Sequence, residues 1–443
     1  MLVFLRAYLY WTVLWGLLAY PALPFRSLLP PLLIGIDVLM MLLAIVYVLM
    51  RLHILVNPRE RSLVCASGFG LVAVCLYGMG TTYANGGSLL EGANYLAVLA
   101  RPLLMLLALF IYTRGVVQPN AVRLWRTLRL DFRLLVAIQL SVACLQLIAP
   151  TTGAEFIPTL VESQSGIWAL ELGHVSGTFP NSIDLAYFLL AAYIALTQEA
   201  WQRHRMPSAL LTALLGYFTY ATGSATATIC FGIYAGFLWL RVLSAKTRWL
   251  VLLFGLGAAL ALIYLNKGVV AELVSAKVED MMLSRLGLIF ISLPDILQIT
   301  PLKLLTGLGA DFTVIDSLLK SLEQVPLLFT YYDSISAIND VFWVALVLAL
   351  GLPVMLLYVM SVSQLFSRYL SGLGIQTTWF TLSNMIMLLI FVAGLLNQIL
   401  AVRSFTTALL IGLAPLAISA ASNRTRRQAD QSTFIPQSLT GTY

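Results

Sequence analysis

Apolar runs of about 20 residues follow one another along most of the chain, separated by shorter polar segments. A helix that crosses the hydrocarbon core of a bilayer, which is about 30 Å thick, needs about 20 apolar residues. The pattern therefore predicts an all-α, polytopic integral membrane protein with about twelve transmembrane helices. The predicted spans are residues 3–22, 30–50, 63–83, 95–113, 133–150, 181–200, 208–222, 225–243, 248–266, 338–360, 377–397 and 403–421.

Two of the segments between these runs, at about 150–180 and 266–337, are longer than a connection requires. Long ordered loops in compact proteins often carry function. Within the second segment, ISLPDILQI and SLLKSLEQV are typical of short amphipathic helices on a membrane surface. We predict a single transmembrane domain over residues 1–421 that contains both loops, followed by a basic tail at 422–443.

Charge is distributed unevenly between the two sides that this topology defines. Most of the 26 Lys and Arg residues lie in the short connections and the tail, together with the acids Glu60, Asp131, Glu199 and Asp430. Cytoplasmic loops of membrane proteins collect Lys and Arg. The sequence therefore predicts cytoplasmic N- and C-termini, with the two large loops in the periplasm of a bacterial inner membrane.

Composition narrows the class of protein further. Hydrophobic residues make up 60% of the chain and charged residues 10%, far from the values of about one half and one quarter in soluble domains. The net charge of +7 reflects the flanks of the spans, so we expect membrane lipid as a partner and no nucleic acid. The sequence has no G-x-x-x-x-G-K-[ST] or H-E-x-x-H motif, and the four cysteines lie in apolar runs without metal-ligand spacing. We expect no metal and no cofactor.

Three arginines, Arg101, Arg285 and Arg403, lie outside the cytoplasmic segments. A charge at membrane depth is costly, so it usually pairs with another charge or lines a cavity. Arg101 could form a structural ion pair or extend to the interface, and Arg285 could be an ordinary loop charge. Guanidinium groups also match phosphate oxygens in a bidentate manner, so three of them near the outer face could hold a lipid-linked diphosphate.

Acids and a histidine near the same face are candidates for proton transfer. Asp340 begins an apolar helix, where helix capping would equally account for an acid, and Asp333 precedes it. His174 lies directly before another span. Asp184 falls in the first turn of that span, where helix capping is the default role for an acid. Asp37 lies inside a predicted span with no obvious partner in the sequence.

Four segments in the second half of the chain resemble the O-antigen polymerase and ligase superfamily of GT-C-like membrane glycosyltransferases. They are GHVSGTFPNSIDLAYFLL, YATGSATATICFGIYAGFLWL, SRLGLIFISLPDILQITPLKLLTGLGADF and INDVFWVALVLALGLPVML, in family order over about 173–356. The chain departs from the family pattern at three positions. Ala225 and His174 stand where relatives often have arginine, and Ile338 stands where the ligase branch carries its histidine.

The resemblance implies glycosyl transfer at the periplasmic face from an undecaprenyl-diphosphate-linked oligosaccharide. A lipid diphosphate leaving group needs positive charge, and an attacking hydroxyl needs at most a weak base. The expected donor-binding residues are Arg285, Arg101, Arg403, Gly307 and Gly309, and the expected catalytic residues are Asp340, His174 and Asp333.

The sequence thus predicts a Wzy-type polysaccharide polymerase of an exopolysaccharide, capsule or O-antigen pathway. A chain-length regulator and a flippase would be its protein partners. A ligase is the nearest alternative, but residues 266–340 contain no histidine of the kind that the ligase branch uses. A polysaccharide flippase or other transporter is the alternative from a different class.

Overall fold

The computed structural model describes residues 2–19, 29–115, 118–148, 173–179, 181–203, 205–244, 301–320, 342–370, 382–394 and 402–433, and scattered positions between 246 and 264. Every regular element in these residues is a helix, as predicted. The first half of the chain forms α1 (Leu2–Leu14), η1 (Trp15–Ala19), α2 (Leu29–Arg51), η3 (Leu52–Ile54), α3 (Pro58–Ala84), α4 (Leu89–Gly115), α5 (Gln118–Ile148) and α8 (Ser182–Arg203). The second half forms α9 (Ala209–Ala221), α10 (Ala225–Val242), α15 (Pro301–Thr306), α16 (Phe312–Lys320), α19 (Phe342–Leu350), α20 (Leu352–Leu370), α21 (Leu382–Gly394) and α22 (Arg403–Thr433).

Six of the described helices are long and apolar enough to cross a membrane. They cover Leu32–Ile54, Pro58–Ala84, Leu89–Gly115, Val122–Ile148, Ser182–Trp201 and Ala225–Val242. Each overlaps a predicted span, although the bounds differ by up to eleven residues, as at Val122–Ile148 against 133–150. The predicted spans at 3–22, 208–222, 377–397 and 403–421 correspond to shorter apolar helices, and most of 248–266 lies outside the described residues. The total of twelve therefore stays a prediction.

The predicted span at 338–360 is divided in two in the structure. Its described part forms α19 and α20, which meet at Gly351, where φ is +77°. An α-helix cannot continue through a residue in the left-handed region, and Pro353, two residues later, lacks the N–H that a continuous helix would need. The apolar composition of this segment did not reveal the break.

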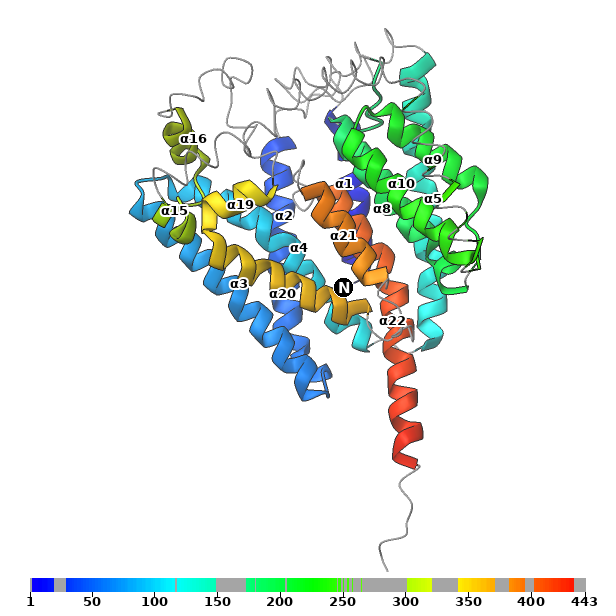
Figure 1. Cartoon of the computed structure of the whole chain (residues 1–443). Helices are drawn as coiled ribbons and strands as arrows, with labels where there is room; N and C mark the ends of the chain where they lie inside the picture. The colour runs from blue at the N-terminus through cyan, green and yellow to red at the C-terminus, as the bar shows by residue number, and fades with distance from the viewer. Residues whose placement is uncertain are drawn as a thin grey trace, which may run out of the picture.

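The helices form two groups joined by a central helix (Figure 1). In the view of Figure 1, α2, α3, α4, α19 and α20 lie on the left, and α5, α8, α9 and α10 lie on the right. Between them α22 packs against α4 on one side and against α8, α1 and α5 on the other. One continuous hydrophobic core runs through both groups, and residues 185–193 of α8 are completely buried in it.

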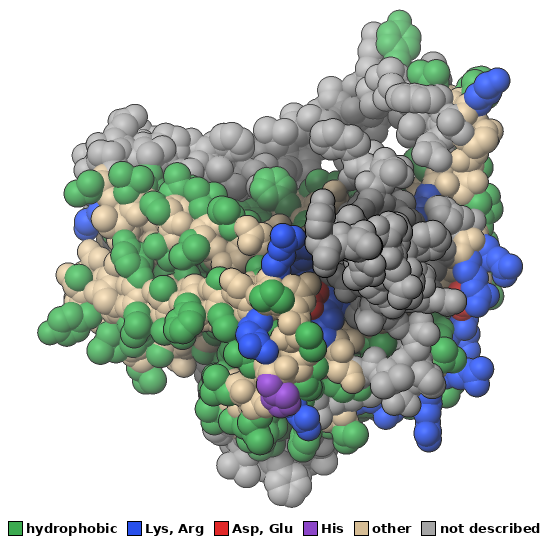
Figure 2. All heavy atoms as spheres, turned by 90° about the horizontal axis from the view of Figure 1, so that it is seen from below, with side chains coloured by type: hydrophobic (Ala, Val, Ile, Leu, Met, Phe, Trp, Pro, Cys, Tyr) green, Lys and Arg blue, Asp and Glu red, His purple; other side chains and the backbone are tan. Residues whose placement is uncertain are grey.

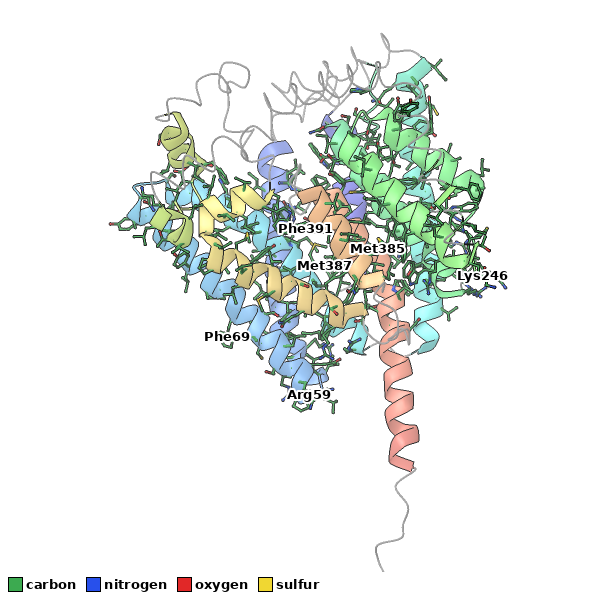
Figure 3. All side chains as sticks on the ribbon, in the orientation of Figure 1. Arg59, Phe69, Lys246, Met385, Met387 and Phe391 are labelled. Atoms are coloured by element: carbon green, nitrogen blue, oxygen red, sulfur yellow. The ribbon has the colours of Figure 1, made fainter. Side chains whose placement is uncertain are left out.

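One end of the bundle is rich in basic side chains, and we call it the basic end. It carries Arg59 at the start of α3 and Lys246 after α10, both labelled in Figure 3, and the view from below in Figure 2 shows Lys and Arg side chains spread over this face. Three of the four acids predicted to be cytoplasmic pair with arginines. The pairs are Arg6 with Asp131 (2.6 Å), Arg114 with Glu60 (3.2 Å), and Arg129 (3.3 Å) and Arg203 (3.0 Å) with Glu199.

Residues 301–320, from the predicted second loop, lie at the opposite end from Arg59. Tyr77, near the end of α3, donates its hydroxyl to the carbonyl of Thr306 at 2.7 Å, and the rings of Tyr95 and Phe312 meet edge to face. The helix α16 overlaps the start of the predicted amphipathic segment SLLKSLEQV, whereas ISLPDILQI lies outside the described residues. In the last described part of the chain, α22 continues without a break through the predicted boundary at 421.

Candidate functional site

A buried ionic cluster joins the two helix groups, and Asp37 of α2 is at its centre. Oδ2 of Asp37 accepts from Nη1 of Arg101 in α4 at 3.1 Å and forms an ion pair with Nε of Arg403 in α22 at 2.7 Å. Oδ1 accepts from the hydroxyl of Tyr8 in α1 at 2.6 Å. The acid for which the sequence offered no partner therefore has three. Two of the three arginines predicted to bind donor phosphate meet at this one carboxylate.

The two arginines of this ionic cluster differ in exposure. The side chain of Arg101 is 2% exposed, whereas that of Arg403 is 32% exposed. Arg403 approaches Asp37 through its Nε, and no hydrogen bond joins its Nη groups to another of the described residues. Arg403 is therefore the arginine of the cluster that can offer a guanidinium edge to a ligand.

The ionic cluster lies deep in the bundle, far from the basic end. Arg101 precedes Arg114 by thirteen residues on α4, a distance of about 20 Å along the helix axis. Two helices also begin at the cluster, α22 with Arg403 itself and α8 at Ser182. Helix N-termini carry partial positive charge and favour anions. Arginines and helix N-termini together make this region suited to an anionic group.

Asp184, in the first turn of α8, lies beside the ionic cluster. It is close enough to Arg403 and Arg101 for their charges to act on its carboxylate. Ser404, next to Arg403, donates its hydroxyl to the backbone carbonyl of Asp184 at 3.4 Å, which joins the starts of α8 and α22. The sequence singled out Asp184 only as a capping residue.

The segment 173–179 is irregular and buried from Val175 onward, and two glutamines of α5 hold it in place. Oε1 of Gln146 accepts from the N–H groups of Ser176 and Gly177, both at 2.9 Å, and Oε1 of Gln139 accepts from the N–H of Thr178 at 2.8 Å. Backbone that is not helical must find such partners when it lies away from water. The clamp fixes the chain just before α8 and thereby fixes the position of Asp184.

His174 packs against the turn between α9 and α10. A Cβ at Gly223 would overlap its imidazole ring, and the next residue, Val175, donates its N–H to the carbonyl of Ala221 at 3.0 Å. Two of the segments that resemble the superfamily therefore lie side by side, one around residues 177–179 (GTF) and the other around residues 222–224 (TGS). Among the described residues no hydrogen bond or ion pair links His174 to the ionic cluster.

Gly307 and Gly309 lie where the second loop contacts the break between α19 and α20. Both have positive φ, and a Cβ on either would approach backbone atoms of neighbouring segments within 2.9 Å. Leu308 and Gly309 donate their N–H groups to the last carbonyls of α19, those of Leu348 (2.7 Å) and Ala349 (3.0 Å). In this structure the two glycines allow close packing of backbone on backbone, and no contact joins them to the ionic cluster within the described residues.

Asp311 completes this contact by capping two helices at once. Its Oδ2 accepts from the N–H of Ser88 before α4 at 2.6 Å, and its Oδ1 accepts from the N–H and hydroxyl of Thr313 in α16. Burial alone would raise the pKa of Asp311, but these hydrogen bonds to the ionised form outweigh it, so the pKa lies below its usual value of 3.8. Asp311 directly precedes α16, but nothing in the sequence indicates its partner Ser88, which lies 223 residues away.

The remaining predicted site residues, Arg285, Asp333 and Asp340, lie outside the described residues. No group of three or more His, Cys, Asp or Glu side chains suited to a metal ion occurs in the part of the chain that the structure describes. Comparison with known protein families and with curated proteins gave no match for the chain.

Proposed function

We propose that this protein is a polymerase that joins undecaprenyl-diphosphate-linked oligosaccharide units at the periplasmic face of a bacterial inner membrane. The observation that carries the proposal is the meeting of Arg101 and Arg403 at Asp37, deep among helices of membrane-spanning length. These arginines come from distant parts of the sequence, and the sequence alone predicts both of them to bind phosphate. The order of the four family-like segments supports the same reaction class.

The two arginines differ in exposure, which suggests that they have different roles. Arg403 is the residue that contacts the donor diphosphate, because its side chain is partly exposed and its Nη edge is available. Arg101 is buried, so it pairs with Asp37 and adds positive charge to the site without contacting the donor. Charge that is already in position when the phosphate leaves costs no reorganisation during the reaction. This preorganisation takes the place of the metal ion that many sugar-nucleotide transferases use.

The experiment that tests the proposal uses purified protein and lipid-linked repeat units extracted from cells that lack it. A polymerase produces a ladder of longer glycans from this single substrate, without nucleotide or divalent metal. Arg403→Ala should abolish the ladder, and Arg403→Lys should recover little of it, because an ammonium cannot reproduce bidentate contact with phosphate. Arg61→Ala, which alters an exposed arginine at the basic end, is the matched control and should leave the ladder unchanged.

A ligase would give a different result in the same assay. It would transfer preformed glycan to a second acceptor, yet make no ladder from repeat units alone. That outcome would refute the polymerase proposal, although the donor would still be a glycan linked to a lipid diphosphate. Deletion of the gene separates the two as well, because loss of a polymerase leaves single repeat units, whereas loss of a ligase leaves long lipid-linked glycan.

Transport is a second candidate function, favoured by the pairing of Asp37 with Arg101 inside predicted spans. Ionisable groups at membrane depth also mark transport pathways. The discriminating measurement places a fluorescent lipid-linked unit in proteoliposomes and follows its movement between leaflets. Movement without elongation would favour a flippase and exclude the polymerase assignment.

A further inference from the structure

Asp184 is an acid without an assigned role, and capping of α8 does not account for it. The cap is Asn181, whose Oδ1 accepts from the N–H of Ile183 at 2.9 Å and whose carbonyl accepts from the N–H of Asp184 at 3.2 Å. The carboxylate of Asp184 therefore does not perform the function that its position in the first turn would normally imply.

The other buried or half-buried acids in the described part of the chain all have partners. Hydrogen bonds or ion pairs hold the carboxylates of Asp37, Glu60, Asp131, Glu199 and Asp311. By contrast, no described residue forms a hydrogen bond or an ion pair with the carboxylate of Asp184, which is only partly buried. Its oxygens are not among the fully buried polar atoms of the described residues, so they are open to a ligand that enters from outside the fold.

The surroundings of Asp184 indicate what would use it. The residue is fixed from both sides, by the clamped segment 173–179 before it and by the contact of its carbonyl with Ser404 after it. Arg403 and Arg101 lie near it without pairing with it. A donor whose diphosphate binds Arg403 would therefore carry its anomeric carbon into the neighbourhood of Asp184.

We propose that Asp184 is the catalytic base of the reaction, an inference that rests on the proposed polymerase function. The carboxylate takes the proton of the attacking sugar hydroxyl as the hydroxyl oxygen forms its bond to the anomeric carbon of the donor. The bond from that carbon to the phosphate oxygen breaks, and undecaprenyl diphosphate leaves with the electron pair, its new charge held by Arg403. Asp184 then returns the proton to water. The transfer consumes no oxidant, metal ion or nucleotide.

The test compares three purified variants for donor binding and for polymerisation. Asp184→Asn keeps the size of the side chain and removes the base, so it should bind undecaprenyl diphosphate as the wild type does and polymerise at least about 100-fold more slowly. Asp184→Ala should regain part of its activity when formate is added, because formate supplies a carboxylate in the vacated space. Glu91→Gln, which alters an exposed acid in the first turn of α4, is the matched control and should polymerise normally.

Each other outcome has a distinct meaning. Polymerisation by Asp184→Asn at close to the wild-type rate would refute the role of Asp184 and leave the proposed function intact. Parallel loss of lipid-diphosphate binding and activity, without formate rescue of the alanine variant, would show a structural role and also refute the inference. Absence of a ladder from the wild-type protein would refute the proposed function itself, and the catalytic base with it.

Discussion

Replacing Gly351 with alanine should separate the second loop from the break between α19 and α20. The backbone at Gly351 has φ +77°, which costs an L-residue about 1–2 kcal/mol. The added Cβ would lie 2.8 Å from the carbonyl carbon of Leu305 and 2.9 Å from the N of Gly307, so the loop backbone must move. The N–H bonds from Leu308 and Gly309 to α19 would then weaken, each worth about 1 kcal/mol. We expect a total loss of about 3–4 kcal/mol.

The assay is unfolding of the purified protein in mixed micelles by titration with SDS, together with hydrogen exchange of residues 301–320. Gly80→Ala is the matched control, because Gly80 lies within α3 and a Cβ at that position would meet no atom within 4 Å. That substitution should stabilise the protein by about 0.5–1 kcal/mol through helix propensity. If Gly351→Ala unfolds within about 0.5 kcal/mol of the wild type, with unchanged exchange in the loop, the packing argument is wrong.

Three further predictions concern other parts of the fold. Asp37→Asn leaves two guanidinium groups without their counter-charge and should cost about 3–5 kcal/mol in the same unfolding assay, whereas Tyr8→Phe should cost only about 1 kcal/mol. Because the pKa of Asp311 is lowered, its stabilisation is present above pH 3.8 and lost as the pH falls further. Amide protection in 301–320, measured relative to the intrinsic exchange rate at each pH, should therefore fall on acidification in the wild type, and protection that does not change with pH would contradict this. Gly177→Ala should destabilise the protein more than Gly173→Ala, because its Cβ would overlap Gln139 whereas a Cβ at Gly173 would meet open space at a similar φ. Equal losses of unfolding free energy in the two variants would show that the glutamine contacts do not stabilise this segment.

The sequence identified the charged residues of the site better than it identified their partners. Arg101 and Arg403 stood out because charge is rare in apolar runs, and an ion pair for Arg101 was one of the expected roles. That this pair would involve Asp37, and that Arg403 and Tyr8 would join it, depends on packing between α1, α2, α4 and α22. Hydropathy records which residues face away from water, not which helices are neighbours.

The resemblance to the superfamily placed Gly307 and Gly309 in donor binding, and whether they bind donor stays a prediction. Their positive φ and close backbone contacts already explain why glycine stands at both positions. The break at Gly351 was equally hidden, because the flanking residues are apolar on both sides and a window of hydropathy averages over a single glycine. Gln139 and Gln146 went unnoticed for a similar reason, since isolated amides in an apolar run have no spacing that signals a clamp.

The central position of α22 has a consequence for how the protein is made. Its contacts with α8, α4, α1 and α5, and the pairing of Arg403 with Asp37, unite early helices with one that leaves the ribosome much later. At translation rates of about 5–20 residues per second, α1 waits roughly 20–80 s before its partner exists. During that interval the early helices must persist in the membrane as a partly assembled intermediate. A chain truncated before Arg403 would remain in that state, exposed to the proteases that remove unassembled membrane proteins.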